Sequence, residues 1–293
     1  MNALYDTEAA VHAIGVLLHE TLEGGNDDGF AHLCDVQPVS YAPCVVQEPK
    51  SLRLAEKGSE QEAIFRIRGV MCQSNLPPVT HIRPGIPGHR LRQSVTLTAL
   101  GSHPVFDKYL SNIQGIADIF RTTFPNEKLA LDGHHTYEGH PCIVVFNRYL
   151  SFRCDTPTTH QIPFDPEVDP QGLLLKHPHQ TMHHTEDNQV LYSRREMKDG
   201  QQSLTKISPT SFENGDIVEA HFSFVSFPTR GKDARRISCV MNHLILLNDR
   251  IRKESNGVST SVAMHPVKFR TLKRKQALVN SEDEERDKRM RTM

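Results

Sequence analysis

Three residues in the second half of the chain have the types and order of an iron-binding set. His184 and Glu186 are followed at a distance by His243. Two histidines and one carboxylate hold Fe(II) in oxygenases, and Arg250 or Arg252 could bind an oxoacid cosubstrate. The pair lies in a histidine-rich loop rather than on a strand, and 17 histidines make a chance match easy. An Fe(II)-dependent, oxygenase-like enzyme is therefore kept as an alternative function.

A second set combines aromatic and basic residues in one predicted β-hairpin, residues 215–248. Its first strand is expected to turn Val218, Ala220, Phe222 and Phe224 into the core, which leaves the other face and the basic tip for contacts. Bases could stack on rings there while cations neutralise phosphates. This pattern favours a non-catalytic protein that binds nucleic acid, single-stranded DNA above all. The predicted contact residues are His221, Phe227, Arg230, Lys232, Arg235 and Arg236.

A third set lies in the polar C-terminal segment. Two basic clusters separated by an acidic spacer fit a two-part nuclear import signal, which an import receptor would bind. We therefore expect the protein in the nucleus, with the cytoplasm as the alternative. The clusters consist of Arg274 and Lys275, then Lys288, Arg289 and Arg291.

The remaining motifs exclude more than they suggest. The six cysteines contain no C-x-x-C pair, which argues against a disulfide scaffold and a structural zinc site. No nucleophile elbow, phosphate-binding loop or dinucleotide fingerprint occurs, so we predict no cofactor and favour a protein without catalytic activity. Whether the histidines of residues 177–187 bind a metal is left open.

The overall charge gives no general attraction to anions. Lys and Arg number 34 against 35 Asp and Glu, so a nucleic-acid site needs a local basic patch. The N-terminus is acidic and no apolar run reaches membrane-spanning length, which predicts an intracellular protein without a membrane partner. The pattern leaves the oligomeric state open, a homo-oligomer included.

The elements that position these residues are mostly strands. Alternating patterns predict strands at 63–72 and 92–100, a strand pair or one bent strand at 142–154, a short hairpin at 190–207 and the hairpin at 215–248. Helices are predicted at 7–22 and from His103 to Phe120. The first helix could instead serve as the docking element of a protein-interaction module, which is a further alternative function.

These elements indicate a mainly β (α+β) fold, an OB-like or related small barrel or meander with inserted helices. We expect a helix and linker at 1–30, the β domain at 40–250, and a disordered tail at 251–293.

Two resemblances add to this prediction. The run from Phe212 through Gly215-Asp216-Ile217-Val218, with the upstream His184-Thr185-Glu186-Asp187-Asn188, resembles an uncharacterised family present in many copies in mushroom-forming fungi. The resemblance covers residues 150–248 and implies no known activity. The last two strands are also loosely similar to those of phage-type, OB-fold, single-stranded DNA-binding proteins, although the chain lacks their strongly acidic C-terminal tail.

Overall fold

The computed structural model describes residues 1, 4–23, 30–48, 50–101, 103–132, 134–177, 181–198, 201–229 and 234–263. The chain divides after Ser259 into two compact units, and all of the described β-structure belongs to the first. The helices are α1 (Thr7–Glu23), α2 (Pro104–Thr123), α3 (Leu173–Lys176) and α4 (Arg250–Ala263). The strands of the N-terminal half are β1 (Ala31–His32), β2 (Tyr41–Gln47), β3 (Lys50–Glu56), β4 (Phe65–Asn75), β5 (Arg92–Thr98), β6 (Lys128–Leu131), β7 (His134–Tyr137) and β8 (His140–Arg148). Those that follow are β9 (Ser151–Phe152), β10 (Met182–His183), β11 (Leu191–Lys198), β12 (Gln201–Lys206), β13 (Ile217–Pro228) and β14 (Ala234–Asn248).

Five strands pair in a closed ring. Its order is β4, β5, β8, β14, β13 and back to β4, and β8 and β14 run parallel while the other pairs are antiparallel. The contact between β8 and β14 is short, with Val240 opposite Phe146. A five-stranded, partly open barrel is the architecture of an OB fold. The mainly β, OB-like fold predicted from the sequence is confirmed.

The core of the barrel comes from the alternation of the long strands. Phe65 of β4, Val95 of β5, Val145 of β8 and Phe222 and Phe224 of β13 are fully buried in one apolar cluster. Successive side chains of a strand point to opposite faces, so the same strands turn their other residues outward. The expected core row of β13 is therefore buried as predicted.

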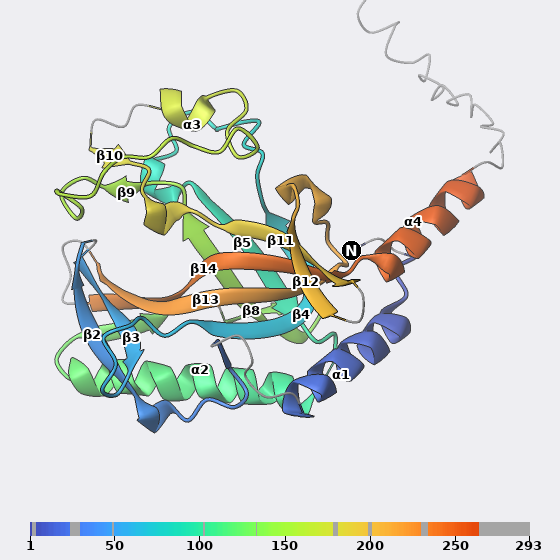
Figure 1. Ribbon diagram of the computed structural model, residues 1–293, viewed down its shortest axis with the longest axis horizontal. Helices are drawn as coiled ribbons and strands as arrows, with labels where there is room; N and C mark the ends of the chain where they lie inside the picture. The colour runs from blue at the N-terminus through green and yellow to red at the C-terminus, as the bar shows by residue number, and fades with distance from the viewer. Residues whose placement is uncertain are drawn as a thin grey trace, which may run out of the picture. The chain divides into compact units, whose positions relative to one another are not determined.

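Two helices are packed against this core (Figure 1). Pro104 stands in the first turn of α2, where its missing N–H costs little, and the His103 side chain accepts a hydrogen bond from Val105 N. In α1, Ala10, Ile14 and Leu18 are at most 1% exposed. The apolar face of α1 is thus buried, and it is not free to act as the docking element considered for a protein-interaction module.

The last described helix lies where the sequence predicts a tail. Arg252 of α4 is buried, and its guanidinium is 2.6 Å from Asp216 and 3.0 Å from Glu213. These ion pairs fix the first turns of α4 on the segment that leads into β13. The sequence pattern does not predict this helix because buried polar residues, Arg252 and Ser255, anchor it along with Ile251, and an apolar stripe is lacking.

Candidate functional site

The outward face of the barrel carries a cluster of arginines and aromatic rings. Arg92 of β5 lies directly opposite Arg148 of β8, and Phe146 lies two residues before Arg148 on the same face. Across the closing strands, Phe227 of β13 pairs with Arg236 of β14. Strand pairing thus brings together residues that are far apart in the sequence.

All of these residues except Arg92 line a cleft of about 490 Å³, called here the barrel cleft. Phe146, Arg148, Phe227 and Arg236 line it from the barrel strands. Its other walls include Arg53 of β3, Asp155 and Asp187 from loops, and the aromatic pair His89 and Phe152. Cations and rings therefore face a concave surface that two carboxylates also reach.

Two arginines in this cluster are held over aromatic rings. The Arg92 guanidinium carbon is 4.8 Å from the centre of the Phe146 ring, and that of Arg148 is 5.0 Å from the centre of Phe227. Within the described residues, neither guanidinium forms an ion pair within 4 Å or a hydrogen bond. Cation–π contact orients these side chains while their N–H donors remain open to a ligand.

The arginines of the cluster repel one another. Like charges directly opposite each other on neighbouring strands are destabilising, and Arg92 and Arg148 form such a pair. Burial and then the nearby Arg236 lower the pKa of Arg148, an effect that Asp132 and Asp155 partly offset. A bound anion would relieve this repulsion.

The predicted contact residues divide into several groups. Phe227 and Arg236 line the barrel cleft; Arg236 keeps 58% of its side chain exposed although it lies 3.2 Å from Asp132. Arg235 instead pairs with Glu127 at 2.9 Å and lies over Phe124. Arg230 and Lys232 lie outside the described residues, as do all five predicted import residues.

His221 is not on an accessible face, and this corrects the prediction that a base stacks on it. Its ring is buried and lies 3.0 Å from the Glu219 carboxylate. That carboxylate also binds Arg68 at 2.7 Å and Arg195 at 2.6 Å. Burial alone would raise the pKa of Glu219, but the hydrogen bond from His221 and the charges of Arg195 and Arg68 lower it below its usual value. His221 therefore belongs to a structural ion cluster.

The predicted iron-binding set does not assemble. The His184 ring stacks on Phe164 and is bonded to the Tyr149 carbonyl at 2.8 Å, whereas His243 contacts Ser193 at 3.0 Å beside the Glu219 cluster. Among the described residues, the His, Cys and carboxylate donors close enough to hold a metal are those of another segment. The spacing that suggested His184, Glu186 and His243 was a chance order in a histidine-rich chain.

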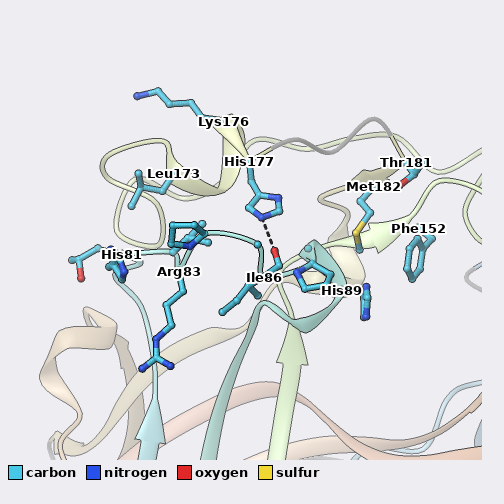
Figure 2. Close-up of a pocket in the computed structure, with 16 residues that line it drawn as sticks. His81, Arg83, Ile86, His89, Phe152, Leu173, Lys176, His177, Thr181 and Met182 are labelled. Atoms are coloured by element: carbon cyan, nitrogen blue, oxygen red, sulfur yellow. Dashed lines mark hydrogen bonds between the residues drawn. The ribbon is translucent and has the colours of Figure 1, made fainter.

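A second cleft, of about 680 Å³, adjoins the barrel cleft (Figure 2). It is lined mainly by residues 80–89 between β4 and β5, and His177 holds this loop with a 2.9 Å contact to the Ile86 carbonyl. His89 and Phe152 line both clefts and stack with their ring centres 5.7 Å apart. The described lining of this second cleft holds Arg83 and Lys176 but no carboxylate.

Sequence reasoning missed Arg92, Phe146 and Arg148. The available signal was weak: both arginines stand at the end of an alternating strand, next to a polar residue. Only the antiparallel register of β5 and β8 shows that they lie opposite each other.

Comparisons with known proteins add little. No family model matches the chain, and no curated protein matches it. One solved structure to which it is similar is gp2.5, a single-stranded DNA-binding protein encoded by bacteriophage T7. The TM-score is 0.33 and the identity 10%, over 63% of this chain and 86% of that one. So distant a likeness carries no argument about function, and nothing in these comparisons points to the fungal family.

Proposed function

We propose that this protein binds single-stranded nucleic acid, DNA in the first instance, in the barrel cleft and without catalysis. The observation that carries the proposal is the cross-strand pair Arg92 and Arg148, whose side chains have no carboxylate partner within 4 Å in the described chain. Arg148 lines the cleft, and Arg92 lies over Phe146, which also lines it. Such a pair costs stability, and a phosphate between the two would reverse the sign of the interaction.

Aromatic groups beside these cations supply the second half of the interaction. Phe227 is half-buried at the edge of the cleft, and the stacked pair His89 and Phe152 borders it from the loops. Stacking of a base on an aromatic side chain contributes about 1–3 kcal/mol and depends little on sequence. The arrangement thus combines phosphate contacts with surfaces for bases.

The concave shape favours an unpaired strand over a duplex. Proteins that read duplex DNA insert a helix or a two-stranded ribbon into a groove, whereas a cleft receives bases that are exposed. OB folds bind oligonucleotides on the face of their second and third strands and on the loops between strands one and two and between four and five. In this barrel those strands are β5 and β8, and the first of these loops forms the second cleft.

The test is fluorescence anisotropy of the full chain with labelled oligonucleotides of about 15 nucleotides, within the range that one OB fold covers. We expect oligo-dT to bind at micromolar protein or below, and a duplex of equal length to bind at least about tenfold more weakly. A single-stranded RNA of the same length identifies the preferred sugar. Equal binding of duplex and single strand, or no binding at all, contradicts the proposal.

We also propose that the two basic clusters of the C-terminal segment direct the protein to the nucleus through an import receptor. Support comes from the sequence alone, since two basic clusters at this spacing suit an acidic receptor groove. A fluorescent fusion of the full chain should accumulate in nuclei. Replacing Arg274, Lys275, Lys288, Arg289 and Arg291 by alanine should leave it spread through the cell, and unchanged nuclear accumulation would contradict the proposal.

A further inference from the structure

The turn that follows β1 brings three metal-ligand atoms together. His32, Cys34 and Asp35 each offer one donor atom, and these atoms all lie within 4.8 Å of one another. The Cys34 sulfur is 3.2 Å from His32 Nδ1 and 3.3 Å from Asp35 Oδ1. A nitrogen, a sulfur and an oxygen thus lie close together in His32, the last residue of β1, and the turn that follows it.

The spacing of the donors suits a small tetrahedral ion. Zinc lies about 2.3 Å from a thiolate sulfur and about 2.0–2.2 Å from nitrogen or carboxylate oxygen, so tetrahedral ligands are about 3.4–3.6 Å apart. The two sulfur distances, 3.2 and 3.3 Å, fall just below these values, and the nitrogen of His32 lies within 4.8 Å of the Asp35 oxygen, so side-chain rotations would bring the three donors to one ion. Calcium and magnesium prefer oxygen ligands, so this donor set favours zinc over either.

The surroundings control the charge of the site. Arg66 and Arg68 lie near His32, and Lys108 lies near Cys34, so an added positive charge would be repelled. A zinc ion bound to a thiolate, a carboxylate and a neutral imidazole carries no net charge. With all three ligands bound, the zinc complex is neutral and is not repelled by the nearby cations. With fewer ligands it would keep a positive charge and would be repelled.

The protonation states of the free ligands define the binding step. Histidine coordinates a metal as the neutral imidazole, and cysteine coordinates it as the thiolate. Binding breaks the S–H bond, forms a sulfur–metal bond and releases one proton to solvent.

We propose that His32, Cys34 and Asp35 bind one zinc ion, with water as the fourth ligand. The site contacts α2, because the Tyr109 hydroxyl is 3.3 Å from both ring nitrogens of His32 and Asn112 donates a 2.7 Å hydrogen bond to the Leu33 carbonyl. Both residues belong to α2, so the ion would fasten the turn after β1 to that helix. The site uses a single cysteine, which is why cysteine spacing argued against zinc.

The experiment measures metal content and geometry in the full chain. After dialysis against zinc and removal of loosely held ions, elemental analysis should find one zinc per chain. Cobalt in its place should give the visible absorption of a tetrahedral ion and a near-ultraviolet sulfur-to-cobalt charge-transfer band. Less than about one tenth of an equivalent of zinc, or cobalt spectra without the charge-transfer band, overturns the proposal.

Variants assign the ligands. Cys34→Ser should abolish the charge-transfer band, and Asp35→Asn should reduce zinc affinity by at least about tenfold, as loss of a ligand does. Asp35 is exposed, so Asp35→Asn should not disturb folding. That variant tests the zinc site if Cys34→Ser fails to fold. The matched control is Cys44→Ser, which removes an exposed thiol elsewhere. Zinc loss in the control, or full zinc content in Asp35→Asn and Cys34→Ser, overturns the assignment.

Discussion

At the scale of single residues, Arg148 is the side chain on which the proposed interface most depends. It lies in the barrel cleft over Phe227, opposite Arg92. We expect Arg148→Ala to weaken binding of oligo-dT about tenfold, since a lost charge-assisted phosphate contact is worth about 1.5 kcal/mol. The melting temperature should fall only slightly, because the substitution also removes the repulsion between Arg148 and Arg92. Anisotropy and a melting curve measure the two effects.

The control for Arg148 is Arg121→Ala. Arg121 is an exposed arginine of α2 that pairs with Asp118, and it does not line the barrel cleft. The Arg121→Ala variant removes one positive charge outside the barrel cleft, so the affinity for oligo-dT should be nearly unchanged. If both variants weaken binding equally, the interaction is general electrostatics and the cleft has no special role.

For Asp155 we expect a substitution to raise the affinity for oligo-dT rather than to lower it. Its half-buried carboxylate lines the cleft and attracts Arg148, so it opposes a phosphate there. Asp155→Asn should tighten oligo-dT binding by up to about fivefold, as expected for a partly screened charge interaction of up to about 1 kcal/mol. A titration at low salt measures it. Weaker binding would instead show that Asp155 accepts hydrogen bonds from the ligand.

At the scale of elements, the Glu219 cluster joins three strands that are distant in the sequence. Arg68 belongs to β4, Arg195 to β11 and Glu219 to β13. Removing the carboxylate takes the charged partner from the buried Arg68 and the half-buried Arg195, which costs about 3–5 kcal/mol when an ion pair is buried. Glu219→Gln should therefore lower the denaturant midpoint strongly. A loss below about 1 kcal/mol would mean that water reaches the cluster.

The pH dependence of this cluster follows from the lowered pKa of Glu219. A carboxylate whose pKa is lower in the folded state stabilises the fold at pH values above its unfolded pKa, about 4.3. That contribution is lost as pH falls further toward the folded pKa. In the wild-type chain, stability should decline steeply below about pH 4, and Glu219→Gln should show a shallower decline.

Predictability from sequence differs between elements for physical reasons. Long strands that alternate apolar with polar residues, such as β4 and β13, were predicted from that pattern, although the structure buries most of both faces, polar residues included. The hairpin of β2 and β3 was missed, since Pro43 and the exposed Val45 hide its alternation. Of the proposed interface, Phe227 and Arg236 could be named from the sequence because they lie on one hairpin, whereas Arg92 and Arg148 meet through a strand pairing that local patterns do not encode.

At the scale of the whole molecule, the net charge of −1 limits how salt can act on binding. Each neutralised phosphate of a single strand contributes about −0.7 to the slope of log K against log salt concentration. Arg92, Arg148 and Arg236 form the described cationic cluster, so we expect a slope of about −2 rather than the much steeper slope of a basic protein. Anisotropy titrations between about 50 and 200 mM salt measure it.

The double variant Arg92→Ala with Arg148→Ala separates local from global electrostatics. It should bring the slope to about −0.7, because one of the three arginines remains. Loss of two positive charges elsewhere, by Arg121→Ala with Arg250→Ala, should leave the slope near −2, since both of those arginines are exposed on helices and pair with neighbouring carboxylates. If the two double variants change the slope equally, the protein binds nucleic acid through positive charges spread over its surface. Phosphates are then not held in the barrel cleft.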